Sequence, residues 1–368
     1  MLFDRRNLRR RRIDKFVDGL LSLSESDMDG IHMKTVNLGF GMLRYPVSEG
    51  KMDCDKWMKA VDSYMEGDFC YFDMHPAYAS GLSERCFREM VAERYPRNRY
   101  LAANKMPYYG IENEQDYERI LEDELLSCGL EYFDYYLVHA LTKERNELHT
   151  RMGGYQFLLK AKKEGRVKHI GFSFHGTPEL LDEILSTHPE MEFVQLQINY
   201  LDWMNPAIRS RELYDTALKH KKPIFVMEPI KGGALASWRM VDGLGMSQSV
   251  LAKKALSFVA ALPGIRIILS GMVDAEQVHE NRSTIREVGI RGNESSKIWE
   301  TYLDLITYAE HSNKIPCTNC RYCGRVCPMK IAVPEIISIL NSVNNMGEND
   351  ITYDARHRSI YTGTIEVE

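Results

Sequence analysis

Short apolar runs alternate with longer amphipathic segments along the chain from Thr35 onward. The apolar runs are rich in Val, Ile, Phe and Tyr, a composition typical of strands that are buried in a parallel sheet. They predict strands at 36–41, 69–73, 100–105, 133–139, 167–173, 193–199, 223–229 and 265–271. The pattern therefore predicts a sheet whose strands are each separated by a long connection.

The amphipathic segments between these runs predict a helix after each strand. The signal is clear at Thr177, where a capping hydroxyl precedes Pro178 at the first helical position. The predicted helices span 55–66, 83–94, 114–127, 152–164, 178–186, 206–219, 247–261 and 275–287. Strict alternation of strands and helices predicts an α/β protein that forms a (β/α)8 TIM barrel.

A smaller region follows the barrel pattern. We expect a further helix at about 295–312, then a cysteine run, a short helix after Pro334 and a polar tail. The predicted units are a basic and polar tail at 1–34, the barrel at 35–293, a small α-helical iron–sulfur segment at 294–343 and a polar tail at 344–368. The N-terminal arginines have two interpretations, either contact with an anionic partner or a tail outside the fold, with Met33 as an alternative start.

Composition excludes several classes of function. The net charge of −5 gives no reason to expect nucleic acid or an anionic membrane as a partner. No apolar run approaches the roughly 20 residues that a membrane-spanning helix needs. The chain has 8 cysteines, half of them scattered, and no apolar leader, so we expect a cytoplasmic protein in a reducing compartment.

The cysteine run near the C-terminus has a specific spacing. It reads C-x2-C-x2-C-x3-C-P, the bacterial ferredoxin pattern for an iron–sulfur cluster. Structural zinc sites instead use two C-x2-C pairs separated by a longer loop. We therefore predict a ferredoxin-like [4Fe–4S] cluster on Cys317, Cys320, Cys323 and Cys327. The fourth cysteine of such a run serves a second cluster in some ferredoxins, so a distant cysteine or an open iron stays an alternative.

Polar residues end most of the predicted strands, at positions where a core residue would otherwise be expected. Catalytic groups of (β/α)8 barrels lie at the carboxyl ends of the strands. Buried polar groups cost roughly 1–3 kcal/mol each unless they are paired, so a ring of them indicates one shared pocket. These residues are Asp73, Lys105, His139, Ser173, Gln197, Asn199, Glu228 and Ser270.

Three of these residues, together with Tyr78, form a coherent catalytic set. A lysine ammonium near a tyrosine favours the tyrosinate, which makes the phenol a stronger acid. We expect Asp73 to pair with Lys105, and His139 to hydrogen-bond a substrate oxygen. Such a set suits hydride addition to a carbonyl, because Tyr78 can protonate the alkoxide that results.

These motifs resemble those of the aldo-keto reductase family. The opening LGFGMLRYP is similar to the family's first strand, and the stretch from Asp73 to Tyr78 resembles its D-x-x-x-x-Y element. Lys105 in AANKMP and His139 in YYLVHA resemble the remaining members of its catalytic tetrad. The resemblance covers about residues 35–290, and the cysteine run is similar to the appendage of a subgroup with a ferredoxin-like tail.

The resemblance also implies NAD(P)H as a cofactor. The implied contacts to the carboxamide, the pyrophosphate and the adenosine are Ser173, Gln197, Glu228, Ile230, Lys231, Gly232, Ser270, Gly271, Met272, Asp274, Gln277 and Asn281. Many family members bind a 2′-phosphate with basic residues at the positions of Gly271 and Gln277. The choice between NAD and NADP therefore stays open.

Three functions are consistent with these residues. The first is an NAD(P)-linked oxidoreductase that acts on a small carbonyl or alcohol and uses the cluster for electron transfer, with ferredoxin or another donor as partner. The second is single-electron reduction or dehydration in the same pocket, driven by the cluster. The third is a non-catalytic subunit that senses nucleotide or redox state. The loop aromatics Tyr108, Tyr109, Trp203 and Trp238 serve either as pocket walls or as packing.

Overall fold

The computed structural model describes most of the predicted barrel and several short stretches after it. The described residues are 36–49, 51–291, 302–309, 323, 327–329, 331–334 and 336–337. The predictions for the tails at 1–34 and 344–368, and for Cys317 and Cys320, lie outside these residues.

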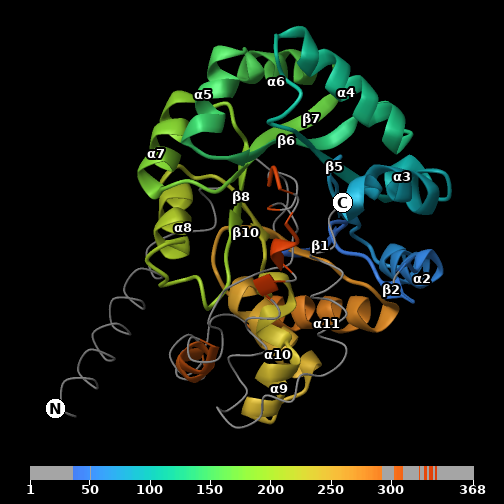
Figure 1. Cartoon of the computed structure of the whole chain (residues 1–368), viewed down its shortest axis with the longest axis vertical. Helices are drawn as coiled ribbons and strands as arrows, with labels where there is room; N and C mark the ends of the chain where they lie inside the picture. The colour runs from blue at the N-terminus through green and yellow to red at the C-terminus, as the bar shows by residue number, and fades with distance from the viewer. Residues whose placement is uncertain are drawn as a thin grey trace.

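Eight parallel strands close into a barrel at the centre of the molecule (Figure 1). They are β1 (Asn37–Gly41), β4 (Tyr71–Asp73), β5 (Leu101–Met106), β6 (Phe133–Leu141), β7 (Val167–Phe174), β8 (Phe193–Gln197), β9 (Ile224–Met227) and β10 (Ile265–Ser270). Each strand pairs with its successor, and β10 closes the ring by pairing with β1. The register sets Gly41 beside Asp73 and Phe40 beside Ser270, so the carboxyl ends meet at one rim. The predicted (β/α)8 barrel is confirmed.

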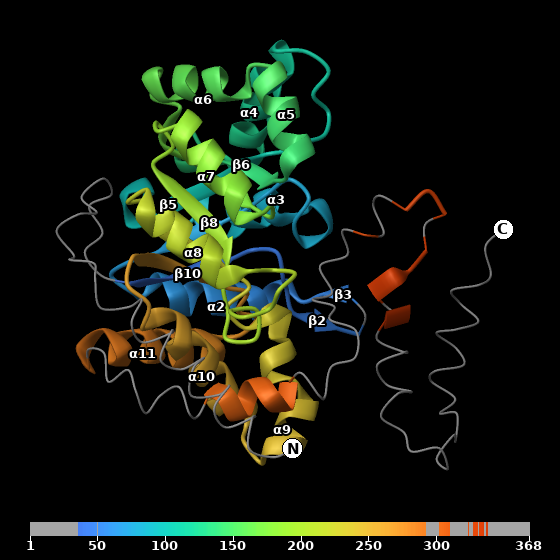
Figure 2. The same cartoon turned by 90° about the vertical axis from the view of Figure 1, so that its left-hand side faces the viewer.

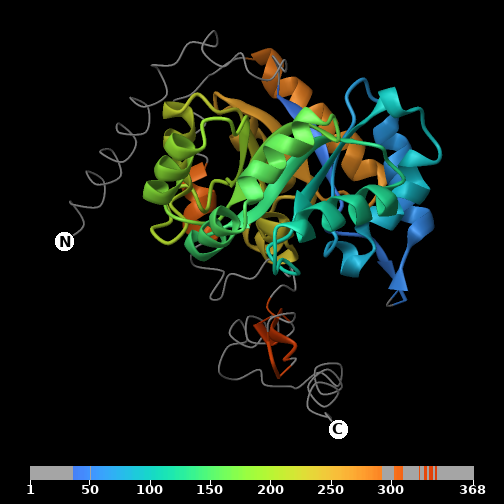
Figure 3. The same ribbon diagram turned by 90° about the horizontal axis from the view of Figure 1, so that it is seen from above.

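Helices surround the strands, as the view from above shows (Figure 3). Those that the pattern predicts are α2 (Cys54–Met65), α3 (Ser83–Phe87), α4 (Gln115–Cys128), α6 (Gly154–Lys163), α7 (Pro178–Thr187), α8 (Ser210–Lys219), α10 (Gln248–Ala260) and α11 (Ala275–Arg291). Thr177 caps α7 as expected, because its side chain accepts the Leu180 N–H at 3.4 Å. Among the described residues, no helix is long and apolar enough to cross a bilayer.

The structure adds elements that the hydrophobic pattern does not predict. They are the hairpin of β2 (Val47–Ser48) and β3 (Lys51–Met52), the helix α5 (Lys143–Arg151) and the helix α9 (Trp238–Leu244). The sequence of α5 is almost entirely polar, and only its His149 is buried. Because α5 has no apolar stripe, its helical state depends on capping by Thr142 and on packing against α6 rather than on periodicity.

Aromatic side chains fill the barrel interior below the rim. The rings of Tyr71, Tyr135 and Phe225 lie 5.3–5.8 Å from one another, and Phe193 stacks on Phe225 at 4.4 Å. Gly171 leaves room for this layer, since a Cβ at Gly171 would lie 2.5 Å from the Phe193 carbonyl oxygen. The barrel is therefore a packed core and not an open pore.

A helical stretch at 302–309 packs outside the barrel beside α10 (Figure 2). Tyr302 Oη donates to the Lys254 carbonyl at 2.8 Å, and the Tyr302 ring lies 5.3 Å from that of Phe258. Gly243 of α9 faces Tyr308 so closely that a Cβ on Gly243 would lie 1.5 Å from Tyr308 Oη. This stretch falls within the helix predicted at 295–312.

Candidate active site

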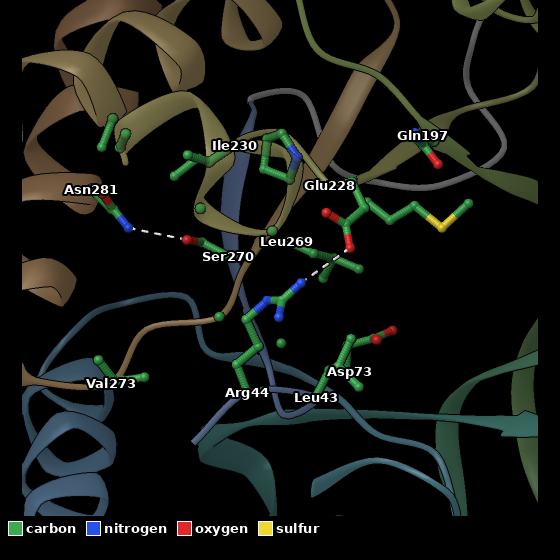
Figure 4. A pocket seen from close by; sticks show the side chains of 18 of the residues that line it. Leu43, Arg44, Asp73, Gln197, Glu228, Ile230, Leu269, Ser270, Val273 and Asn281 are labelled. Carbon is green, nitrogen blue, oxygen red and sulfur yellow. Dashed lines mark hydrogen bonds and ion pairs between the residues drawn. The ribbon is translucent and has the colours of Figure 1, made fainter. Parts of the chain in front are cut away.

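A cavity of about 1150 Å³ opens at the rim where the barrel strands end. Its wall includes Asp73 from β4, His139 from β6, Ser173 from β7, Gln197 from β8 and Ser270 from β10. Asp73, Gln197 and Ser270 approach it from different sides (Figure 4). Sites for one small ligand usually measure about 300–1,000 Å³, so this cavity has room for an extended ligand and a second, smaller one.

A buried ion pair lies beside Tyr78. Lys105 is fully buried, and its Nζ lies 2.5 Å from Asp73 Oδ2. The ammonium also donates to the Met74 carbonyl at 2.8 Å, while Gln195 Nε2 donates to the other oxygen of Asp73 at 3.2 Å. Lys105 Nζ lies 4.5 Å from the centre of the Tyr78 ring, within the range of a cation–π contact. The expected pairing of Asp73 with Lys105 is present, and its positive charge lies against the phenol.

Burial and pairing act in opposite directions on Lys105. Burial lowers the pKa of Lys105 below its ordinary value, and the Asp73 carboxylate opposes that shift. Removing one partner of a buried ion pair typically costs about 3–5 kcal/mol, because the other charge is left uncompensated. We therefore expect Lys105 to remain an ammonium only while Asp73 beside it is ionised.

His139 faces Tyr78 across the cavity. Its side chain is 4% exposed, and its ring lies 3.8 Å from that of His75 and 6.1 Å from that of Tyr78. Burial, reinforced by the neighbouring His75 and Lys105, holds the pKa of His139 well below the usual 6.5. The imidazole is therefore neutral near pH 7 and can donate an N–H to an oxygen without adding a charge.

Most of the residues implied for a dinucleotide line the same cavity: Ser173, Gln197, Glu228, Ile230, Gly232, Ser270, Gly271, Asp274, Gln277 and Asn281. Asn281 Nδ2 donates to Ser270 Oγ at 3.2 Å (Figure 4). Asp274 Oδ1 accepts the Gln277 N–H at 2.9 Å at the start of α11. These contacts order the N-terminal end of a long helix, a place that favours anionic groups.

Two members of the implied set, Lys231 and Met272, are not among the residues that line the cavity. Lys231 is 7% exposed, and its Nζ pairs with Asp202 Oδ1 at 2.5 Å instead of facing the cavity. Asp202 Oδ2 also accepts from Gln197 Nε2 at 2.7 Å, so the pair anchors the loop after β9 to the end of β8. Met272 is 1% exposed and packs in the hydrophobic core. Neither side chain is placed to contact a ligand in the cavity.

A second ion pair spans the rim. Arg44, in the turn after β1, lies 3.5 Å from Glu228 Oε1 (Figure 4). Burial raises the pKa of Glu228, and Arg44 opposes that shift. The Arg44 side chain also passes Gly271, where an added Cβ would lie 3.2 Å from the arginine Cβ. A basic residue therefore does lie beside Gly271, but it comes from another part of the chain.

Four of the seven non-glycine residues with left-handed backbone in the described part of the chain lie in segments that form the rim. The non-glycine residues Ala79, Ala140, Glu228 and Lys231 have φ values of 48°, 53°, 56° and 48°. Such left-handed conformations cost roughly 1–3 kcal/mol each and persist where the surrounding structure enforces them. Ala140 directly follows His139, and its N–H donates to Ser173 Oγ at 2.6 Å. The strain therefore coincides with the polar residues of the cavity.

Two of the four predicted cluster ligands belong to the described residues. Cys323 lines the cavity, and the Cys327 N–H donates to the Cys323 carbonyl at 3.1 Å. Both cysteines are half-buried and form no disulfide. This i to i+4 backbone hydrogen bond brings the two cysteines close together.

Several residues around the site were not identified from the sequence. Gln195 could have been, because it lies two positions before Gln197 on one face of β8. His75 also had a signal, since it lies inside the stretch from Asp73 to Tyr78. Asp202 and Arg145 had none, because their contacts depend on how distant loops approach one another.

The loop aromatics divide between the two roles expected of them. Tyr108 lines the cavity, whereas Trp203 is 4% exposed and packs in the core. Tyr109 is 46% exposed and packs edge-on against Tyr108. The side chain of Trp238 lies outside the described part of the structure.

Comparisons with known proteins agree with this geometry. Residues 37–250 match the model of the aldo/keto reductase family, whereas no curated protein matches the chain. An aldo/keto reductase from Klebsiella pneumoniae in complex with NADP and acetate superposes with a TM-score of 0.54 at 17% identity, covering 73% of this chain and 90% of that one. An aldo-keto reductase from Bacillus halodurans in its holo form superposes with a TM-score of 0.56 at 18% identity, covering 73% of this chain and 91% of that one. Since the family match spans more than half of the sequence, the chain belongs to the aldo/keto reductase family and is an oxidoreductase.

Proposed function

We propose that this chain interconverts a small carbonyl compound and its alcohol, with NAD(P)H as the hydride source and Tyr78 as the proton donor. The observation that carries this proposal is the setting of Tyr78. It lines the cavity, the buried Lys105–Asp73 pair lies against its ring, and a neutral His139 lies across from it. A bound reduced nicotinamide would supply a hydride to the carbonyl carbon.

The chain's own residues would manage the charge on the substrate oxygen. Tyr78 transfers its phenolic proton to that oxygen as the carbonyl π bond breaks, so the product leaves as a neutral alcohol. The Lys105 ammonium stabilises the tyrosinate that remains until solvent returns a proton. His139 donates an N–H to the same oxygen and adds no net charge.

The residues at the other end of the cavity fit a dinucleotide. Gly232 has a φ of 63°, a conformation that brings backbone close to a ligand without strain in glycine. Arg44 and the start of α11 would face the phosphates, and Ser173 would contact the carboxamide. Lys231 supports the loop through Asp202 and would not contact the phosphates directly.

Replacing Tyr78 by Phe tests the proposal. Loss of a general acid typically costs about 10²–10⁴-fold, so kcat for carbonyl reduction should fall in that range. The dissociation constant for NAD(P)H, followed by fluorescence, and the circular dichroism spectrum should stay unchanged. Tyr132→Phe is the matched control, because it removes a phenol just before β6, at the opposite end of the barrel. Wild-type kcat in Tyr78→Phe would eliminate this assignment.

A second candidate function is favoured by Cys323. We propose that the cysteine run holds a [4Fe–4S] cluster at the cavity mouth, because Cys323 lines the cavity that contains Tyr78 and Asp73. The turn from Cys323 to Cys327 suits two ligands of one cluster, and the sequence supplies Cys317 and Cys320 as the others. Such a cluster would supply single electrons to this site, from ferredoxin or another donor.

An anaerobic assay separates the two routes. If the cluster feeds the site, reduced viologen should support turnover without NAD(P)H, and Cys323→Ala should abolish that activity together with iron content. Cys54→Ala is the control, because Cys54 is a free, exposed cysteine on α2. Turnover with NAD(P)H alone, unchanged in Cys323→Ala, would reject the single-electron route and leave the hydride route standing.

A further inference from the structure

Arg145 is a cationic side chain on the cavity wall that the proposed chemistry does not use. It lies in the first turn of α5, and its side chain lines the cavity together with Tyr78, Tyr108 and His139. Its charge also contributes to the lowered pKa of His139, after burial, His75, Lys105 and His175.

The position of the guanidinium is fixed by neutral groups. Arg145 Nη1 donates to the Ala140 carbonyl at 2.7 Å, and Arg145 Cζ lies 3.6 Å above the centre of the Tyr108 ring. Thr142 caps the helix by accepting the Arg145 N–H at 3.4 Å. A carbonyl and an aromatic ring orient the charge but do not neutralise it, so the guanidinium is ordered and remains a full cation.

Within the described part of the chain, no carboxylate forms an ion pair with Arg145. Other arginines of this protein do have such partners: Arg44 with Glu228, Arg97 with Asp134, Arg166 with Glu118 and Arg209 with Glu179. Glu144 is adjacent in sequence, but its carboxylate accepts a hydrogen bond from Thr142 Oγ1 at 2.7 Å.

The charges that line the cavity are divided between its two ends. The wall from β9 to α11 contributes four carboxylates, and one of them, Glu228, is paired with Arg44; the other three are Asp274, Glu276 and Glu280. Arg145 lies on the opposite wall beside His139 and His175. His139 is neutral near pH 7 and cannot balance an anion by itself. No described carboxylate balances the Arg145 charge, so an anionic substrate group is attracted to this wall, whereas Arg44 at the other wall is paired with Glu228.

We propose that Arg145 binds a carboxylate on the substrate, so that the natural substrate is a carboxylated carbonyl compound. A single guanidinium presents parallel N–H donors in a plane, which matches a carboxylate in two-point contact. With Nη1 held by Ala140, the rest of the fork is oriented by the Tyr108 ring. This inference rests on the proposed function, because it places the carboxylate beside the carbonyl that Tyr78 would protonate.

Matched substrates test the inference. We expect the wild-type protein to prefer 4-oxobutanoate over butanal, and 5-oxopentanoate over pentanal, by roughly 10- to 100-fold in kcat/KM, the usual effect of a hydrogen bond to a charged group. Arg145→Met should remove that preference by raising KM for the carboxylated aldehydes much more than KM for the neutral ones, and Arg145→Lys should restore part of the preference. Arg151→Gln is the control, since Arg151 ends the same helix, is exposed and does not line the cavity.

A binding measurement separates this inference from the proposed function. Calorimetry with butanoate and butanamide needs no turnover, and butanoate should bind the wild-type protein but not Arg145→Met. If no carbonyl is turned over but butanoate still binds the wild-type protein and not Arg145→Met, the proposed function fails while the carboxylate site stands. Equal losses for charged and neutral substrates in Arg145→Met would overturn the site. A preference of the wild-type protein for glyceraldehyde 3-phosphate over both glyceraldehyde and the carboxylated aldehydes would also overturn the site, because it would indicate a phosphate as the bound group.

Discussion

At the scale of single residues, buried carboxyl groups in this barrel fall into two electrostatic classes. Asp73 and Asp202 each accept a hydrogen bond from a lysine ammonium at 2.5 Å. Glu84 and Glu124 lie between β5, α3 and α4 and have no such partner among the described residues. Burial raises the pKa of Glu84 to about 7 and that of Glu124 well above its usual value. The first class serves the cavity, whereas the second makes stability depend on pH.

Replacing Glu84 by Gln should stabilise the protein at alkaline pH. The pKa of Glu84 is about 7 in the folded state, against an unfolded value of about 4.5, so its contribution is favourable below pH 4.5 and is lost as pH rises toward 7. Between pH 4.5 and 8, that loss should amount to about 2–3 kcal/mol in the wild-type protein. Gln can keep the hydrogen bond from Asn104 Nδ2, which measures 2.7 Å, and cannot ionise.

Urea unfolding of Glu84→Gln and the wild-type protein across this pH range provides the measurement. The difference in unfolding free energy should grow with pH in favour of the variant. Glu122→Gln is the control, because Glu122 lies exposed on α4 and should leave the pH profile unchanged. Parallel profiles for the wild-type protein and Glu84→Gln would show that the Glu84 carboxyl is solvated in the folded state.

At the scale of elements, one glycine decides how the helix at 302–309 lies on the barrel. Gly243 is in α9, and the Tyr308 side chain occupies the space that a Cβ on Gly243 would need. Alanine normally stabilises a helix interior over glycine by up to about 1 kcal/mol. Here an added Cβ would overlap the Tyr308 hydroxyl and ring, and the cost of that overlap outweighs the gain in helix propensity.

We predict that Gly243→Ala destabilises the protein by about 1–3 kcal/mol, the range for overpacked sites. Denaturant unfolding measures the change. The double variant Gly243→Ala with Tyr308→Ala should recover most of it, because the second substitution removes the clashing ring. If Gly243→Ala were neutral or stabilising, Tyr308 would have to leave α9 without cost, and this contact would not hold the helix at 302–309 on the barrel.

At the scale of the whole molecule, barrel closure gathers residues that are far apart in sequence. Gly41 lies beside Asp73 because β1 pairs with β4, and Ser270 lies beside Phe40 because β10 pairs with β1. The resulting cavity extends from Gly41 to Asn281 in sequence and includes Cys323 from beyond the barrel. Its two walls differ in charge, since the carboxylates of β9 to α11 face the wall that carries Arg145. A cavity with two such ends can orient an elongated pair of ligands.

The hydrophobic periodicity of the sequence was sufficient to predict the barrel strands but not the polar helix α5. The eight strands bury nearly all of their side chains, so their apolar runs are visible along the sequence. The helix α5 buries only His149, so no period reveals it, yet it presents Arg145 to the cavity. The site residues at strand ends were predictable for a related reason, because a polar residue that ends an apolar run stands out from its neighbours.

The sequence by itself determined the fold class, the family and the candidate positions of Asp73, Tyr78, Lys105 and His139, since each depends on local pattern or spacing. Only the tertiary structure decided which polar side chains face the cavity and which are neutralised in ion pairs. Lys231 looks like a phosphate ligand in sequence, but its charge is taken by Asp202, a residue 29 positions earlier. Arg145 looks like an ordinary surface cation, but no described carboxylate reaches it. Ion pairing acts through space between distant loops, so it cannot be read from the order of residues along the chain.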